Sequence, residues 1–240
     1  MRRLILAFGF LTRLPMPHVA AEPGDFAAAV RLYPLVGLAI GALVAGAGWI
    51  GSLIDPWVGA CAALLTWTAV TGALHLDGLA DLTDGLGAAH GDRTRLLAVM
   101  SDPHIGSFGV VAIVGQMLSK LVALHAIGAT TWWPLIFIAA AARLGPLVWA
   151  PLLPPLRPEG LAAAVSDAVR PRDLIGWGLL LLLACVPAPV LLATPFLILG
   201  YAAWLRHKIG GITGDAHGAG IELVETGLLL AFCASAALLR

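Results

Sequence analysis

Three aspartates stand close together in the stretch HLDGLADLTDGLG, which follows a long apolar run. Asp77, Asp81 and Asp84 are spaced i, i+4 and i+7, so on a helix they occupy a sector of roughly 60°. Like charges this close repel one another unless a cation lies among them, and clustered carboxylate oxygens suit Mg²⁺. The triplet therefore predicts a metal site in which these aspartates are ligands and catalytic groups. The alternative is a solvated loop whose aspartates are surface residues and turn formers.

Glycines surround these acids, and Gly78 and Gly85 are the two that we predict to contact substrate. Because they lack side chains, a bulky phosphorylated ligand can approach the backbone there. Carboxylates that hold a divalent cation, next to glycines, indicate a diphosphate site. The chemistry this favours is phosphoryl or phosphonucleotidyl transfer to an alcohol, in which metal ions neutralise the diphosphate and an aspartate accepts the hydroxyl proton.

A second group of acids follows in the stretch GGITGDAHGAGIELVETG. Asp215 lies between glycines, while Glu222 and Glu225 enter the last apolar run. Acids inside a membrane span are costly and usually functional. We predict Asp215 and Glu225 as metal ligands, and Gly214 and His217 as substrate-binding residues. For Glu222, a place at the interface with access to water is equally consistent.

A third candidate segment is SDPHIGSFG. Asp102 either caps the helix that follows or joins the metal site. His104 and Gly106 are predicted to bind substrate phosphate, and for His104 the alternative is an ordinary loop histidine. Lys120 and Arg143 lie inside apolar runs, where each either pairs with a buried acid or binds an anionic substrate.

The elements that must position these residues are membrane helices. Of the 240 residues, 60% are hydrophobic and only 12% charged, about half the charged fraction of a soluble domain. Apolar runs of near-spanning length recur along the chain, so we expect an all-α, polytopic membrane helical bundle in a single domain, 1–240. The formal net charge of zero implies no attraction to nucleic acid.

About seven transmembrane helices are expected from apolar length and chain breakers, after an interfacial N-terminal segment, 1–32. They are 33–54, 57–76, 107–127, 132–153, two short spans within 174–205, and 221–239.

Basic residues alternate with these spans. They precede the first span and follow the second, fourth and sixth, whereas the turns 55–56, 128–131 and 187–194 contain no Lys or Arg. The positive-inside rule then predicts a cytoplasmic N-terminus. It places the two acidic segments, 77–106 and 206–220, on the cytoplasmic side as active-site segments.

Five stretches together resemble one family. They are FLTRLPMP, YPLVGLAIG, HLDGLADLTDGLG, MSDPHIGSFG and GGITGDAHGAGIELVE. They occur in the order found in the cobalamin synthase family, the adenosylcobinamide-GDP ribazoletransferases, and they are spread over nearly the whole chain. This sequence departs from the family pattern at His104, where arginine is common, and at His217, where leucine is usual.

The resemblance implies a Mg²⁺-dependent reaction of adenosylcobinamide-GDP with α-ribazole or its 5′-phosphate. It yields adenosylcobalamin, or its 5′-phosphate, and GMP. The resemblance implies that Asp77, Asp81 and Asp84 are metal ligands and catalytic residues. Asp102, Asp215 and Glu225 match the acids of the family's other blocks. It also implies a multi-pass protein of the prokaryotic inner membrane whose active site faces the cytoplasm. It leaves open a homo-oligomer or association with other corrinoid-pathway enzymes.

Two other functions compete with this interpretation. A CDP-alcohol-type membrane phosphotransferase shares the D-G-x-A-D-x-x-D arrangement, but its usual arginine after the alanine and its downstream aspartate pair are missing here. A secondary transporter would account for the proline-broken segment near 187–195 and for Lys120 and Glu225 within spans. Against a transporter, the acids gather toward one face and no internal repeat is visible.

Overall fold

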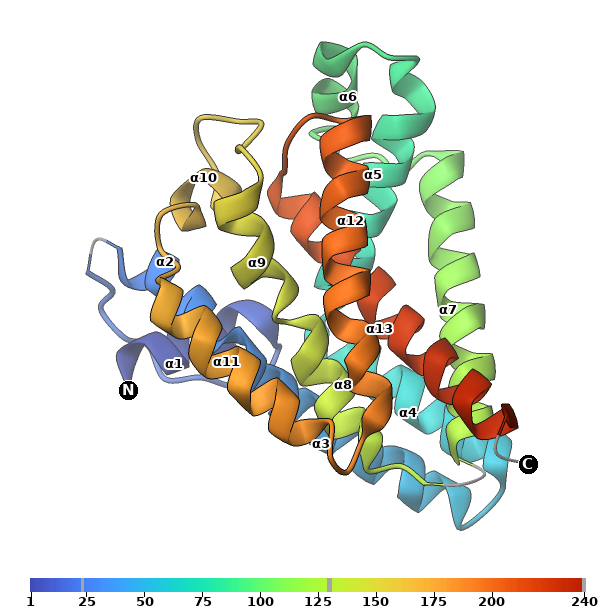
Figure 1. Cartoon of the computed structure of the whole chain (residues 1–240). Coiled ribbons are helices and arrows are strands. Elements are labelled where there is room, and N and C mark those ends of the chain that lie inside the picture. The colour runs from blue at the N-terminus through green and yellow to red at the C-terminus, as the bar shows by residue number, and fades with distance from the viewer. Residues whose placement is uncertain (23, 129–130, 239–240) are drawn as a thin grey trace.

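The computed structural model describes residues 1–22, 24–128 and 131–238, and within them it is built of helices (Figure 1). The predicted all-α, polytopic membrane bundle is confirmed. Its helices, α or short 3-10 (η), are α1 (Arg2–Leu11), α2 (Asp25–Ala29), η1 (Val30–Leu32), α3 (Tyr33–Ser52), α4 (Pro56–Thr71), α5 (Leu74–Ala89), α6 (Arg93–Val99), α7 (Ser107–Gly128), α8 (Pro134–Ala142), α9 (Gly145–Leu152), α10 (Leu161–Val165), α11 (Pro171–Ala184), η2 (Pro189–Ala193), α12 (Thr194–Lys208) and α13 (Gly214–Leu238).

Five helical stretches in the described part of the chain are long and apolar enough to cross a membrane, and a bent pair of helices makes a sixth if it counts as one span. The predicted count of seven is therefore not confirmed, and the side of the N-terminus remains a prediction. Segment 174–205 is divided into separate helices, α11 and α12, as predicted, but only the stretch Pro189–Lys208 is long and apolar enough to be a candidate span. The 14 residues of α11 reach only about 21 Å, short of the roughly 30 Å hydrocarbon core.

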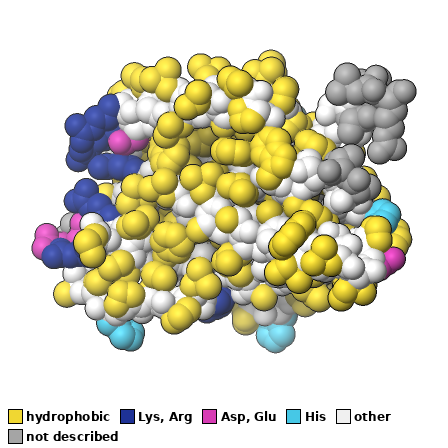
Figure 2. Space-filling view, turned by 90° about the horizontal axis from the view of Figure 1, so that it is seen from below, with side chains coloured by type: hydrophobic (Ala, Val, Ile, Leu, Met, Phe, Trp, Pro, Cys, Tyr) yellow, Lys and Arg dark blue, Asp and Glu magenta, His cyan; other side chains and the backbone are white. Residues whose placement is uncertain are grey.

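Apolar side chains cover much of the outer surface. Seen from below, one face is largely hydrophobic, and its charged side chains gather toward the edges (Figure 2). Exposed leucines, valines and phenylalanines recur on α7, α11 and α12, including Val111, Leu183 and Phe196. Such a surface is unfavourable in water and suits contact with lipid chains.

The bent pair is α4 and α5, whose axes differ by 84°. α4 ends at Thr71, and Gly72 and Ala73 both have positive φ before α5 begins at Leu74. The Ala73 N–H closes α4 with a 3.0 Å hydrogen bond to the Thr68 carbonyl. The predicted span 57–76 is therefore too long, because the αL turn that glycine favours ends the helix earlier. The three aspartates still share one helix, α5, as their spacing predicted.

The C-terminal helix α13 lies at the centre of the packing, against α5, α7 and α8 (Figure 1). Just before it, the turn at Ile212 pairs with the loop that follows α9. The Ile212 N–H donates to the Pro154 carbonyl at 2.9 Å, and the Leu156 N–H donates to the Ile212 carbonyl at 2.9 Å. These two bonds hold the 153–160 loop beside the start of α13.

Candidate active site

The close approach of α5 to α13 brings the two predicted acidic blocks together. At Gly78 a Cβ atom would lie only 2.6 Å from the backbone oxygen of Asp215, so this contact requires glycine. As a result Asp77 and Asp215 line the same cavity, and Asp81 lies one turn further along α5. The sequence prediction that these acids share a site fits this arrangement.

The start of α13 is fixed by a side-chain cap. The hydroxyl oxygen of Thr213 accepts the Ala216 N–H at 3.1 Å, an arrangement typical of a helix N-cap. Asp215 therefore lies in the first turn of α13, where the free N–H groups and the helix dipole favour a negative charge. The G-I-T-G-D sequence thus places a carboxylate at a helix N-terminus.

Electrostatic interactions link four of the acids. Asp81 is half-buried and is repelled by the charges of Asp77, Asp84 and Asp215. The guanidinium of Arg157 attracts both Asp81 and Asp215. Arg157 is not among the site residues predicted from the sequence. Its only signal was its place in a basic loop predicted to lie on the same side as the acids.

Asp84 differs from its two neighbours. It is buried, and its carboxylate oxygens accept the backbone N–H groups of Gly106 at 2.7 Å and Gly109 at 2.9 Å. Gly106 lies just before α7 and Gly109 in its first turn, so Asp84 caps α7 from α5. A Cβ atom at Gly106 would come within 2.4 Å of this carboxylate. Gly106, which was predicted to bind substrate, thus also leaves the space that the Asp84 carboxylate occupies.

Asp102 and His104 lie in the exposed loop before α7. Asp102 Oδ1 accepts the His104 N–H at 2.9 Å and lies 2.7 Å from His104 Nδ1. These hydrogen bonds, the backbone one first, hold the pKa of Asp102 below its usual value. The suggestion that Asp102 caps the following helix is wrong, because the capping carboxylate is that of Asp84. For His104 the structure shows an ordinary exposed loop position.

Lys120 and Arg143 are paired with acids inside the bundle. Lys120 Nζ lies 2.7 Å from Glu222 Oε2 and 2.5 Å from Glu225 Oε2, and Arg143 Nη1 pairs with Glu225 Oε1. All four side chains are buried, so Glu222 does not reach water as one alternative had it. Of the two alternatives for Lys120 and Arg143, the structure shows pairing with buried acids. Glu225, predicted as a metal ligand, lies in this balanced cluster.

Gly85 lies on another side of α5 from the cavity. A Cβ atom there would meet the Met100 side chain at 2.6 Å, so Gly85 makes room for the packing of Met100. Its predicted substrate contact has no support from this position. Gly214 and His217, by contrast, both line the cavity.

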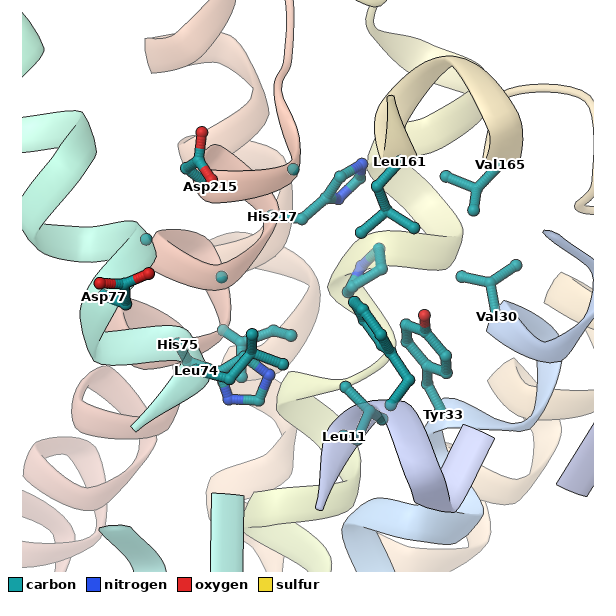
Figure 3. Close-up of a pocket in the computed structure, with 16 residues that line it drawn as sticks. Leu11, Val30, Tyr33, Leu74, His75, Asp77, Leu161, Val165, Asp215 and His217 are labelled. Carbon is teal, nitrogen blue, oxygen red and sulfur yellow. The ribbon is translucent and has the colours of Figure 1, made fainter. Parts of the chain in front are cut away.

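That cavity has a volume of about 210 Å³ and lies between α5, α13 and the N-terminal helices (Figure 3). Asp77 and Asp215 stand on one side of it, and Val30, Tyr33 and Val165 on the other. The arrangement can hold charged groups of a ligand beside the acids and an apolar group among the remaining side chains.

The donor set suits a hard cation. Within the described residues, no three His, Cys, Asp or Glu side chains converge closely enough to hold a metal by themselves. Mg²⁺ in enzymes usually takes only one or two carboxylates, and substrate phosphates and water complete its shell. Asp77, Asp81 and Asp215 offer oxygen ligands of this kind, so the residues fit Mg²⁺ bound together with a diphosphate.

Comparisons with known proteins agree with the sequence resemblance. Residues 3–233 match the family model described as cobalamin-5-phosphate synthase. A protein of Novosphingobium aromaticivorans named adenosylcobinamide-GDP ribazoletransferase is 56% identical, with 96% of this chain and 95% of the relative aligned. Proteins of the same name from Thiobacillus denitrificans and Brevibacillus brevis are 44% and 33% identical; the alignments cover 100% and 98% of this chain, and 98% and 99% of those relatives. No solved structure matches the chain. The chain therefore belongs to the cobalamin-5-phosphate synthase family.

Proposed function

We propose that this protein is a Mg²⁺-dependent transferase that joins adenosylcobinamide-GDP to α-ribazole or its 5′-phosphate. The products are adenosylcobalamin, or its 5′-phosphate, and GMP. The observation that carries the proposal is the meeting of Asp77 and Asp81 with Asp215 beside a cavity. In a chain of this family, that geometry suits a diphosphate donor and an alcohol acceptor.

The reaction is a displacement at phosphorus. The ribose hydroxyl oxygen of the acceptor forms a bond to the cobinamide-linked phosphorus, and the bond from that phosphorus to the GMP oxygen breaks. The hydroxyl proton passes to a carboxylate, and we assign this role to Asp81, which interacts with Asp77, Asp84 and Asp215. A carboxylate that accepts this proton during attack lowers the barrier.

The diphosphate needs positive charge around it. Mg²⁺, held by Asp77 and Asp215 together with the substrate phosphates, would neutralise the phosphate oxygens and stabilise the leaving group. The charge of Arg157 attracts Asp81 and Asp215, and we propose that its guanidinium also attracts a phosphate that binds beside them. Asp84 supports the site indirectly, because it fixes the start of α7 next to the acids.

The membrane fixes where this chemistry occurs. We propose that the acid cluster faces the cytoplasm, as the distribution of basic residues in the sequence suggests. Both substrates would then enter from the cytoplasm without crossing the bilayer. Whether the chain acts as a homo-oligomer or beside other corrinoid-pathway enzymes stays a prediction.

The direct test is turnover by purified protein in detergent with adenosylcobinamide-GDP, α-ribazole and Mg²⁺. We expect cobalamin and GMP in equal amounts, and loss of product after chelation of Mg²⁺ or in Asp81→Asn. The matched control is Asp167→Asn, at an exposed aspartate outside the cluster, which should keep full activity. Folded wild-type protein that makes no product would contradict the proposal, and product that survives chelation would contradict the metal requirement.

A further inference from the structure

Two buried histidines line the cavity without hydrogen-bond partners. His75 on α5 is 2% exposed and His217 on α13 is 4% exposed. Neither ring nitrogen of either side chain has a partner among the described residues. Buried polar groups are nearly always hydrogen-bonded, because leaving one unpaired costs free energy. Two unpaired imidazoles on one cavity wall therefore point to a ligand that supplies their partners.

The two histidines stand in mirrored order relative to the acids, as His75-x-Asp77 on α5 and Asp215-x-His217 on α13. Asp77 is exposed and Asp215 partly exposed, whereas both imidazoles are buried. The lining of the cavity thus combines more exposed carboxylates with buried imidazoles, and Figure 3 shows Asp77, Asp215, His75 and His217 around it.

The rest of the inner wall is mainly apolar or aromatic. The apolar and aromatic side chains that line it include Phe10, Leu11, Val30, Tyr33, Leu161 and Val165. A flat hydrophobic ring would gain by leaving water for such a wall. The wall offers little to a group whose edge carries many hydrogen-bonding atoms.

The size of the cavity narrows the choice of ligand. Pockets that enclose a drug-sized molecule usually measure about 300–1,000 Å³, and this cavity measures about 210 Å³. It has room for one bicyclic ring but not for a corrin macrocycle. Among the parts of the two proposed substrates, the guanine and the adenine of the donor and the base of the acceptor remain.

Hydrogen bonding distinguishes the acceptor base from the two purines of the donor. Guanine and adenine each carry several hydrogen-bonding atoms along their edges, and an apolar wall would leave most of them unpaired. The benzimidazole-type base of α-ribazole is apolar along its fused edge and has one free ring nitrogen, which accepts a hydrogen bond. An imidazole side chain carries at least one N–H donor in either tautomer, so one of these histidines can supply the donor that the acceptor base needs.

We propose that this cavity is the subsite for the aromatic base of the acceptor nucleoside, with the N–H donor of His217 facing its free ring nitrogen and His75 beside the same ring. The inference rests on the proposed function and names the part of the substrate that each end of the cavity holds. With the base inside, the ribose lies toward Asp77 and Asp215, where its hydroxyl meets the diphosphate.

Two substitutions test this assignment in the full-length protein. His217→Leu removes the N–H donor, and Val165→Phe fills the cavity from α10. Each should raise the KM for α-ribazole, by about tenfold for the lost hydrogen bond, while the KM for adenosylcobinamide-GDP changes less than about twofold. His125→Leu is the control, because that imidazole stacks on Trp57 and does not line the cavity.

Equilibrium dialysis with α-ribazole alone separates this inference from the proposed function. Binding that both variants weaken supports the subsite even if wild-type protein shows no turnover, in which case only the proposed function fails. Normal turnover with an unchanged KM for α-ribazole in both variants overturns the subsite and leaves the proposed function intact. A rise confined to the KM for adenosylcobinamide-GDP also overturns it, because the cavity would then hold part of the donor.

Discussion

The carboxylate of Asp84 on α5 accepts the backbone N–H of Gly106 at 2.7 Å, 22 residues further along the chain. A second bond from the Gly109 N–H, at 2.9 Å, uses the other oxygen of the same carboxylate. One member of the aspartate triplet therefore closes the start of α7. Its neighbours Asp77 and Asp81 remain available for ligand.

Asp84→Asn should destabilise the protein. The amide keeps one acceptor oxygen but turns an N–H₂ group toward a backbone donor, and a buried group that loses its partner costs about 1–3 kcal/mol. We expect a lower midpoint of thermal unfolding in detergent, whereas Asp81→Asn should leave that midpoint nearly unchanged. If Asp84→Asn kept its stability and lost only Mg²⁺ affinity, Asp84 would be a metal ligand rather than a helix cap.

The buried cluster of Lys120, Arg143, Glu222 and Glu225 should show strong coupling. Glu225→Gln leaves two buried cations with one carboxylate, and breaking a buried pair in this way costs about 3–5 kcal/mol. Adding Lys120→Met should recover part of that loss. Unfolding free energies of the two single variants and the double variant measure the coupling, and strictly additive losses would contradict this account.

Much of the candidate site could be predicted from the sequence, because spacing along a helix determines which side chains project in the same direction. The interval from Asp77 to Asp81 predicted a shared helix face, and the structure places both on α5. The distribution of basic residues predicted that the segment of Asp215 lies on the same side of the membrane, and Asp77 and Asp215 do line one cavity. The family resemblance drew on the same two blocks.

Sequence reasoning could not predict how deeply a side chain is buried or which side chain it pairs with. Helical period does not say how far Glu225 lies from the surface, so its pairing with Arg143 was only one of several alternatives. Asp84 was predicted to be catalytic from its spacing alone. Its hydrogen bonds to the start of α7 depend on how two helices pack, so they could not be predicted from the sequence. Arg157 was missed because its position depends on the backbone bonds between the Pro154 segment and Ile212, which have no signal in residue type.

Arg157 should matter for binding the diphosphate substrate. It attracts Asp81 and Asp215, and its Nη2 atom donates to the Leu97 carbonyl at 3.0 Å and to the Ser101 hydroxyl at 2.8 Å. Arg157→Ala should raise the KM for adenosylcobinamide-GDP by about tenfold or more, as expected for a lost charge-assisted hydrogen bond.

Ser101→Ala separates this role of Arg157 from loop anchoring, because it removes the side-chain partner and keeps the guanidinium. Its KM for adenosylcobinamide-GDP should stay close to that of the wild type, and Arg157→Lys should fall between wild type and Arg157→Ala. Equal effects of Ser101→Ala and Arg157→Ala would mean that Arg157 only holds its loop in place.

Gly78→Ala should reduce activity more than any effect on stability explains. The new methyl group would lie 2.6 Å from the Asp215 backbone oxygen, so α5 and α13 must move apart and separate Asp77 and Asp81 from Asp215. Because a displacement of about 1 Å can cost about 100-fold in rate, we expect a kcat reduced by that order. Gly115→Ala on α7 is the matched control, since no atom lies within 4 Å of its added Cβ. Steady-state rates at saturating Mg²⁺ measure both variants, and a Gly78→Ala protein as active as Gly115→Ala would show that this helix contact does not set the spacing of the acids.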